Sequence, residues 1–108
     1  MDLTIFTGDS KSLLVTVTDG NSNPVDLTGA QSIVWALIQN DEIILKKTLS
    51  TGISITSATT GQCIVAISAS DTIALTPGTY SHECRVVTSS GQSGIVFTGT
   101  LSVNKAHV

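Results

Sequence analysis

The side chains with the strongest potential for metal chemistry are two cysteines and one histidine. His82 and Cys84 lie two residues apart in one predicted strand and face the same side, and Cys63 lies in another strand. Thiolates and imidazoles bind zinc, but a structural zinc site uses four ligands and usually a close pair of cysteines. The sequence offers no fourth ligand. We expect no metal centre but two core thiols, kept reduced in a cytoplasm or paired with each other, and a partly buried imidazole.

A second candidate is a run of oxygen-bearing side chains. Asp19, Asn21 and Asn23 alternate along the chain and Asp26 follows, which resembles half of a calcium loop. A proline occupies the position that an EF-hand loop reserves for glycine, and an alanine occupies the position of its glutamate. We therefore expect a turn built on Asn and Asp side chains rather than a calcium site.

Groups arranged for catalysis do not stand out. The sequence has no Gly-x-Ser-x-Gly turn between a strand and a helix, and Glu42 and Glu83 are far apart in the chain rather than paired. Gly91 and Gly94 belong to a predicted hairpin and precede no helix, so they do not form a phosphate loop. We expect a non-enzymatic protein with no cofactor and no small-molecule substrate.

The composition is that of a single β domain. Of its 108 residues, 41% are hydrophobic and 12% are charged, against about 25% charged in ordinary domains. The net charge is −3 and the only basic pair is Lys46-Lys47, so we expect no nucleic-acid partner. Few charges with many Ser and Thr suit a subunit of an assembly, although hydroxyls that simply solvate the strands explain them as well.

Targeting segments are not evident. Residues 1–3 carry no basic side chain, and the long uncharged run from Thr48 to Ser70 is too rich in Ser, Thr and Gly to span a membrane. We expect synthesis in a cytoplasm and no membrane partner.

Alternating apolar and polar residues predict about eight strands separated by turns. They fall at 2–6, 12–19, 32–39, 43–49, 53–56, 63–68, 80–89 and 95–103. One domain over residues 1–104, with a polar tail at 105–108, accommodates them. The spacing predicts an all-β fold, an antiparallel sandwich of about seven to nine strands.

The segment from Asp71 to Tyr80 refines this fold. Asp71 to Leu75 is predicted to form a helical turn capped by Asp71, and Pro77-Gly78 a sharp corner. Tyr80 then opens a strand, as in the tyrosine corner of immunoglobulin-like sandwiches, where the ring is buried and the hydroxyl bonds to nearby backbone. We assign Trp35, Tyr80, Pro77 and Gly78 to the structural core.

The strand around Trp35 is apolar on both faces. Val34, Ala36 and Ile38 alternate with the core residues of this strand. They form either the second face of a central strand, covered by the other sheet or a loop, or a contact face for a partner. We take these three residues as the candidate contact face.

Several short motifs, taken in order along nearly the whole chain, resemble one family. They are Phe6–Ser10, Val17–Gly20, Pro24–Ala30, the Trp35 strand, Gly52–Ile55, Gly61–Val65, Asp71–Leu75 and Pro77–Tyr80. Their order is similar to that of immunoglobulin-like domains encoded by tailed bacteriophages and prophages, such as the N-terminal domain of baseplate upper proteins. The resemblance implies a structural protein of the virion without catalytic residues. Its implied partners are other virion proteins and, in a symmetric assembly, further copies of itself.

The position in the particle stays open at this point. Baseplate upper proteins continue into a long stem, whereas this sequence ends at Val108, so a place in the tail or in capsid decoration is equally compatible. A host-surface or carbohydrate-binding module is the other alternative. Sugar platforms usually need exposed aromatic rings, and Trp35 and Tyr80 are expected in the core.

Overall fold

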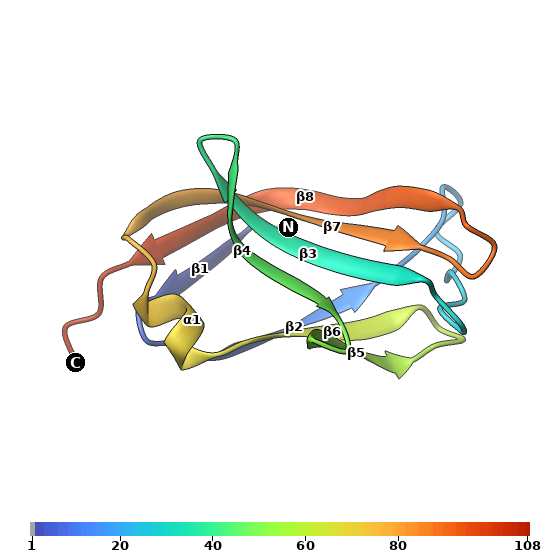
Figure 1. Cartoon of the computed structure of the whole chain (residues 1–108), viewed down its shortest axis with the longest axis horizontal. Helices are drawn as coiled ribbons and strands as arrows, with labels where there is room; N and C mark the ends of the chain where they lie inside the picture. Colours follow the sequence, from blue (N-terminus) through green and yellow to red (C-terminus); the bar gives the residue numbers. More distant parts are fainter. Residues whose placement is uncertain (1) are drawn as a thin grey trace.

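Residues 2–108 fold into eight strands and one short helix (Figure 1). The computed structural model describes residues 2–108, so Met1, with which the predicted domain begins, lies outside the described residues. The strands are β1 (Leu3–Phe6), β2 (Lys11–Thr16), β3 (Ser32–Gln39), β4 (Glu42–Leu49), β5 (Gly52–Ser57), β6 (Gln62–Ile67), β7 (Gly78–Val87) and β8 (Ser93–Asn104). The helix is α1 (Ala69–Ile73). Within residues 2–108, no helix has the length and apolar character needed to cross a membrane.

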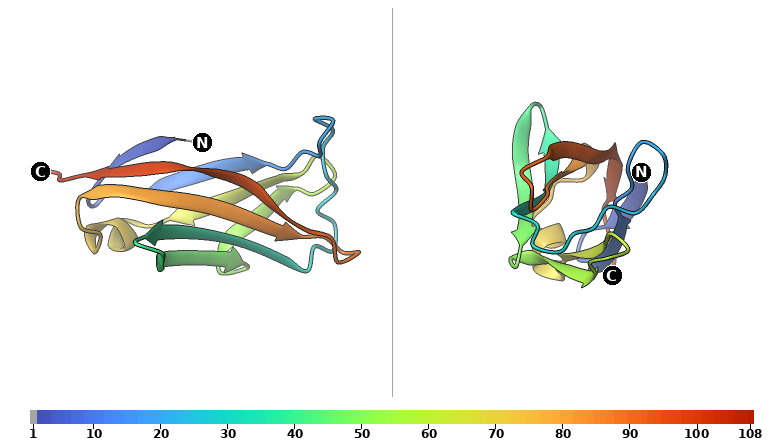
Figure 2. Two further views of the ribbon diagram at one scale, coloured as in Figure 1. Left: turned by 90° about the horizontal axis from the view of Figure 1, so that it is seen from above. Right: turned by 90° about the vertical axis from the view of Figure 1, so that its right-hand side faces the viewer.

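The strands form one hydrogen-bonded series that curls into two facing layers (Figure 2). Their order is β1-β8-β7-β3-β4-β5-β6-β2. The turn from one layer to the other lies between β4 and β5, which pair in parallel over only two residues each. β1 also pairs in parallel, with the end of β8. The remaining pairings, those other than β4–β5 and β1–β8, are antiparallel. This is an immunoglobulin-like β-sandwich, which confirms the predicted fold class.

The core lies between the layers and is filled by the inward residues of the central strands. From β3 these are Ile33, Trp35 and Leu37, and from β6 they are Cys63 and Val65, all essentially without solvent exposure. They belong to one continuous apolar cluster. Burying side chains of this size at about 25 cal/mol per Å² supplies the main stabilising free energy of the fold.

The corner before β7 is fixed by the Tyr80 side chain. Its ring is buried, and its hydroxyl donates a hydrogen bond of 2.6 Å to the carbonyl oxygen of Thr76, as a tyrosine corner does. The sequence assigns Pro77 and Gly78 to the structural core, but both are exposed. Their role is to shape the bend, which turns the chain back over the end of the sandwich and therefore lies at the surface.

The helical turn before this corner differs from the prediction. α1 begins and ends earlier than 71–75, and its N-cap is Ser68 rather than Asp71. The Ser68 hydroxyl accepts the Asp71 N–H at 3.2 Å, and the Asp71 carboxylate accepts the Ser68 N–H at 2.9 Å. This reciprocal pair is a capping box, in which the acidic residue stands three positions after the cap.

Two contacts hold α1 against the rest of the sandwich. The fully buried Thr72 donates its hydroxyl to the carbonyl oxygen of Asp9 at 2.6 Å, beyond the end of β1. Lys47 of β4 forms an ion pair of 2.7 Å with Asp71. The helix therefore closes one end of the sandwich. After β8, residues 105–108 form no strand, although the Ala106 N–H donates to the Thr7 hydroxyl at 3.0 Å.

Candidate docking surface

The register of β3 decides which of its two apolar faces turns outward. Trp35 lies opposite Cys84 of β7 and Lys47 of β4, all on the inner side. Val34, Ala36 and Ile38 therefore point away from the other layer. Val34 and Ile38 are half-buried, and Ala36 is only 6% exposed because side chains of the two neighbouring strands flank it.

We call this outer surface of the sheet the β3 face. Three rows of outward side chains cross it from strand to strand, and each row contains one outward residue of β3. In order from β4 to β8, the rows are Thr48–Val34–Arg85–Ile95, Lys46–Ala36–Glu83–Thr98 and Ile43–Ile38–Ser81–Thr100.

The apolar parts of the β3 face that reach solvent lie at its margins. Ile43 is 60% exposed and Ile95 is 42% exposed. Ile43 follows a two-residue turn in which Asn40 and Asp41 both have positive φ, the geometry of a tight hairpin. This hairpin projects beyond the sandwich in Figure 1. Exposed apolar side chains at the margins of a face whose centre is half-buried are compatible with a protein-binding surface.

A hollow of about 300 Å³ lies beside this hairpin. Ile38, Ser81 and Thr100, which share one row of the β3 face, are among its lining residues. The surface therefore carries an apolar projection, Ile43, and a depression in the same row.

The charges of the β3 face are not neutralised within the molecule. Among the described residues the one ion pair is Lys47–Asp71, so Lys46 and Glu83 form none although they lie on either side of Ala36. Arg85 donates a hydrogen bond of 2.8 Å to the Ser93 hydroxyl. An exposed charge without a partner keeps its full capacity for an opposite charge on another protein.

The sequence contained a sign that an isoleucine near Ile43 would be exposed at the margin of this face. Ile43 and Ile44 are adjacent in a strand, so their side chains point to opposite sides and one must leave the core. Ile44 is 44% exposed as well, and it lies at the register shift between β3 and β4, in the hairpin that projects from the sandwich (Figure 1). Sequence reasoning concentrated on Val34, Ala36 and Ile38 and missed these two.

The side chains considered above as zinc ligands, His82, Cys63 and Cys84, form part of the interior. His82 is fully buried rather than partly buried, and its Nδ1 accepts the indole N–H of Trp35 at 3.1 Å. The His82 ring also meets the Phe97 ring edge-on, with centroids 5.3 Å apart. Nδ1 is thus occupied as an acceptor. In residues 2–108 no three His, Cys, Asp or Glu side chains are grouped as metal ligands.

Both cysteines are buried free thiols. Burial raises the pKa of Cys63, and burial together with the nearby charge of Cys63 raises the pKa of Cys84 to about 12. A thiol needs its deprotonated form to act as a nucleophile or metal ligand. Cys63 and Cys84 therefore serve as small apolar packing groups at neutral pH.

The acidic run after β2 folds as a turn. One carboxylate oxygen of Asp19 accepts the N–H groups of Asn21 and Asn23 at 2.8 and 3.0 Å, and Asp26 accepts the N–H of Thr28 at 2.8 Å. These hydrogen bonds are those of Asx turns. They direct the carboxylates toward their own backbone rather than toward a common centre.

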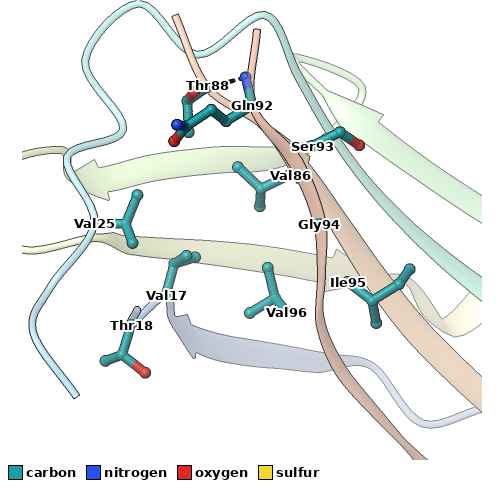
Figure 3. Close-up of a pocket in the computed structure, with 10 residues that line it drawn as sticks. All are labelled: Val17, Thr18, Val25, Val86, Thr88, Gln92, Ser93, Gly94, Ile95 and Val96. Carbon is teal, nitrogen blue, oxygen red and sulfur yellow. Dashed lines mark hydrogen bonds between the residues drawn. The ribbon is translucent and has the colours of Figure 1, made fainter. Parts of the chain in front are cut away.

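A second hollow, of about 230 Å³, opens between the first half of β8 and the loop after β2 (Figure 3). It is lined by apolar side chains, including Val17, Val25, Val86 and Val96, with hydroxyl and amide groups at its rim and no ionisable group. It exists because β1 pairs only with residues 101–104 of β8. The hollow can receive an apolar group but offers nothing for proton transfer.

Comparison with known proteins adds nothing beyond this class of fold. No protein-family model matches the chain, and no curated protein matches it in sequence. Among solved structures, CopC from Methylosinus trichosporium OB3b is similar with a TM-score of 0.44 and 12% identity, over 91% of this chain and 98% of CopC. AggA, the major subunit of aggregative adherence fimbriae type I from Escherichia coli, is similar with a TM-score of 0.40 and 15% identity, over 95% of this chain and 89% of AggA.

Proposed function

We propose that this chain is a non-enzymatic structural protein of a bacteriophage particle, which acts by docking through its β3 face onto proteins of the particle, whether other virion proteins or further copies of itself. The observation that carries the proposal is that one face of a domain with few charges presents two exposed isoleucines, Ile43 and Ile95, together with charges that form no ion pair among the described residues. A surface of this kind excludes water from its apolar parts only when another protein covers it.

The phage context is supported by the order of the sequence motifs, which resembles that of phage-encoded immunoglobulin-like domains. The immunoglobulin-like sandwich is compatible with this resemblance. A place in the baseplate or tail follows most directly from it, and decoration of the capsid uses the same kind of contact. In each case the chain is made in the cytoplasm of the host and ends in the virion.

Binding of host carbohydrate receives less support. Trp35 and Tyr80 are buried and Phe97 is half-buried, so Phe6 is the one exposed aromatic ring among the described residues. A single ring is a small platform for a sugar, which usually stacks on an exposed aromatic surface. The β3 face itself contains no aromatic side chain.

The test is incorporation into particles. The phage or prophage that encodes the chain is grown with the wild-type gene, with Ile43→Glu or with Leu14→Glu, and purified particles are analysed by quantitative mass spectrometry. Leu14 is the matched control, because it is 56% exposed and lies on β2, in the opposite layer. We expect wild type and Leu14→Glu in the particles and strongly reduced incorporation of Ile43→Glu, since a buried unpaired carboxylate is costly. A wild-type chain abundant in the lysate but missing from particles contradicts the proposal.

A further inference from the structure

We infer that the β3 face binds a second copy of this chain, about a twofold axis that runs along β3 and passes close to Ala36. The inference rests on the proposed function, because it names the occupant of the same docking surface. Most soluble homo-oligomers are built on twofold axes, and such an axis requires one patch to be complementary to itself. The arrangement of charge and shape on the β3 face meets that requirement.

The charges give the first argument. A twofold axis along β3 keeps the direction of the strands and exchanges the two flanks, so that β4 of one copy lies over β7 of the other. Lys46 and Glu83 stand one strand away from Ala36, on opposite sides of it and in the same row. Each Lys46 then meets the partner's Glu83, and the contact occurs twice. Within residues 2–108 of its own chain, neither residue forms an ion pair.

The same pattern argues against the other simple arrangement. An axis running across the strands keeps β4 over β4 and β7 over β7, so Lys46 meets Lys46 and Glu83 meets Glu83. Like charges placed together in an interface cost several kcal/mol. The charge pattern therefore favours one axis both by attraction and by exclusion of the alternative.

Shape gives the second argument, and it requires the same axis. In the row Ile43–Ile38–Ser81–Thr100, exchange of the flanks brings the exposed Ile43 of one copy over the partner's Ser81. There it reaches the hollow of about 300 Å³ that Ser81, Thr100 and Ile38 help to line. Each copy thus offers one projection and one depression to the other.

The small side chain on the axis completes the fit. Ala36 meets Ala36 at the centre of the pair, where a bulky residue would hold the two sheets apart. Packed sheets approach to about 10 Å, and side chains of the two faces then interdigitate. In the row Thr48–Val34–Arg85–Ile95, Arg85 lies over the partner's Thr48, whose hydroxyl can accept a hydrogen bond.

Charge exchange tests the pairing directly. The purified chain, Lys46→Glu, Glu83→Lys and the double variant are compared by sedimentation velocity over a range of concentrations. We expect a wild-type dimer, a dissociation constant raised about tenfold or more by each single change, and recovery in the double variant, because the reversed pairs match again. Lys11→Glu makes the same change in charge on β2 of the other layer and should leave the dimer intact.

Two further variants test the projection and the position of the axis. Ile43→Ser should weaken the dimer without altering the fold, because Ile43 is 60% exposed in the single chain. Ala36→Cys should be joined to its own copy by a bifunctional maleimide that spans about 10 Å, since residues on a twofold axis meet their own copies across packed sheets at about that distance. Cys63 and Cys84 are buried and should not contribute to this product.

Specific outcomes overturn the pair. A wild-type chain that stays monomeric at the highest concentration it reaches contradicts it, as does a dimer that tolerates both single charge reversals or is not restored by the double one. A dimer in which Ala36→Cys fails to cross-link places the axis elsewhere and also overturns it. Incorporation into particles is measured separately, so a monomer found in virions rejects the pair and leaves the proposed function standing.

Discussion

The inner and outer faces of β3 are both apolar, yet the fold treats them differently. Ile33, Trp35 and Leu37 on the inner face are essentially without solvent exposure, because the other layer covers them. Val34 and Ile38 on the outer face are covered only from the sides, by the flanking strands, and remain half-buried. The apolar composition of a strand thus indicates that both of its faces are suited to burial. The arrangement of the strands in the fold decides which of the two faces the same chain covers.

The two adjacent lysines of β4 show the same contrast for charge. Lys47 lies on the inner side, opposite Trp35, and is satisfied within the chain by the ion pair of 2.7 Å with Asp71. Lys46 lies on the outer side, and no carboxylate of the described chain pairs with it. The fold therefore completes the inner lysine, whereas the outer one would be completed by the proposed partner.

The largest expected effect is that of removing the central inner side chain. Trp35→Ala should lower the free energy of unfolding by about 3–5 kcal/mol, because it leaves a cavity in a packed core. It also removes the donor to His82 Nδ1. Urea denaturation followed by circular dichroism measures the loss.

A matched pair of variants sharpens the result for Trp35. Trp35→Phe keeps most of the volume and removes only the indole donor, so it should cost less than Trp35→Ala. Val34→Ala, on the outer face of the same strand, should cost clearly less than either. A loss for Val34→Ala as large as that for Trp35→Ala would mean that both faces are covered within one chain.

A smaller effect is expected at the corner, where an inner side chain holds backbone rather than another side chain. Tyr80→Phe should cost about 1.5 kcal/mol, because it removes the hydrogen bond of 2.6 Å to Thr76 while keeping the buried ring. Thermal unfolding of the two proteins measures the difference. An unchanged midpoint would show that the ring, and not its hydroxyl, fixes the corner.

Local patterns in the sequence were sufficient for much of the inner structure. Alternation predicts about eight strands, and the described residues form eight. Tyr80 after a Pro-Gly corner predicts the bond from its hydroxyl to nearby backbone, because both partners lie within a few residues. Ser68 was missed as the N-cap because Asp71 is also a favoured cap, and only the Ser-x-x-Asp spacing identifies the reciprocal pair.

Features that depend on distant parts of the chain were not predictable in this way. The short parallel pairing of β4 and β5 joins the layers, and no local pattern specifies it. The exposure of Pro77 and Gly78 depends on where the bend before β7 meets the end of the sandwich, and the hairpin that carries Ile43 projects away from the sandwich (Figure 1). The outer rows bring together residues from four strands, so their complementarity becomes visible only in the assembled sheet.

A still smaller effect on the free energy of unfolding is expected from breaking the ion pair between Asp71 and the inner lysine, Lys47. Partial burial favours a raised pKa for the Asp71 carboxyl, but hydrogen bonds from Lys47 and Ser68 outweigh it and hold the pKa below its ordinary value of 3.8. Asp71→Asn should cost about 0.5–1 kcal/mol at neutral pH, since Asn keeps an acceptor for the Ser68 N–H but loses the charge.

The pH dependence of this variant follows from the lowered pKa. A carboxyl whose pKa is lower in the folded state stabilises the protein above its ordinary pKa, and this stabilisation is lost as the pH falls through the folded pKa. Between about pH 5 and about pH 2, wild type should therefore lose more stability than Asp71→Asn, and their unfolding midpoints should converge. A difference that stays constant over this range would show that the charge of Asp71 is not involved.

The smallest effect on folding is expected on the outer face, and it separates this face most clearly from the inner one. Val34→Thr keeps the β-branched shape suited to a strand and adds a hydroxyl that water can solvate in the single chain. The free energy of unfolding, measured on dilute protein, should change by no more than about 0.5 kcal/mol. The same hydroxyl becomes costly when a partner covers it without offering a hydrogen bond, so self-association measured by sedimentation should weaken. A large loss of stability in the dilute protein would show that Val34 is covered by its own chain, and the distinction between the two faces of β3 would then fail.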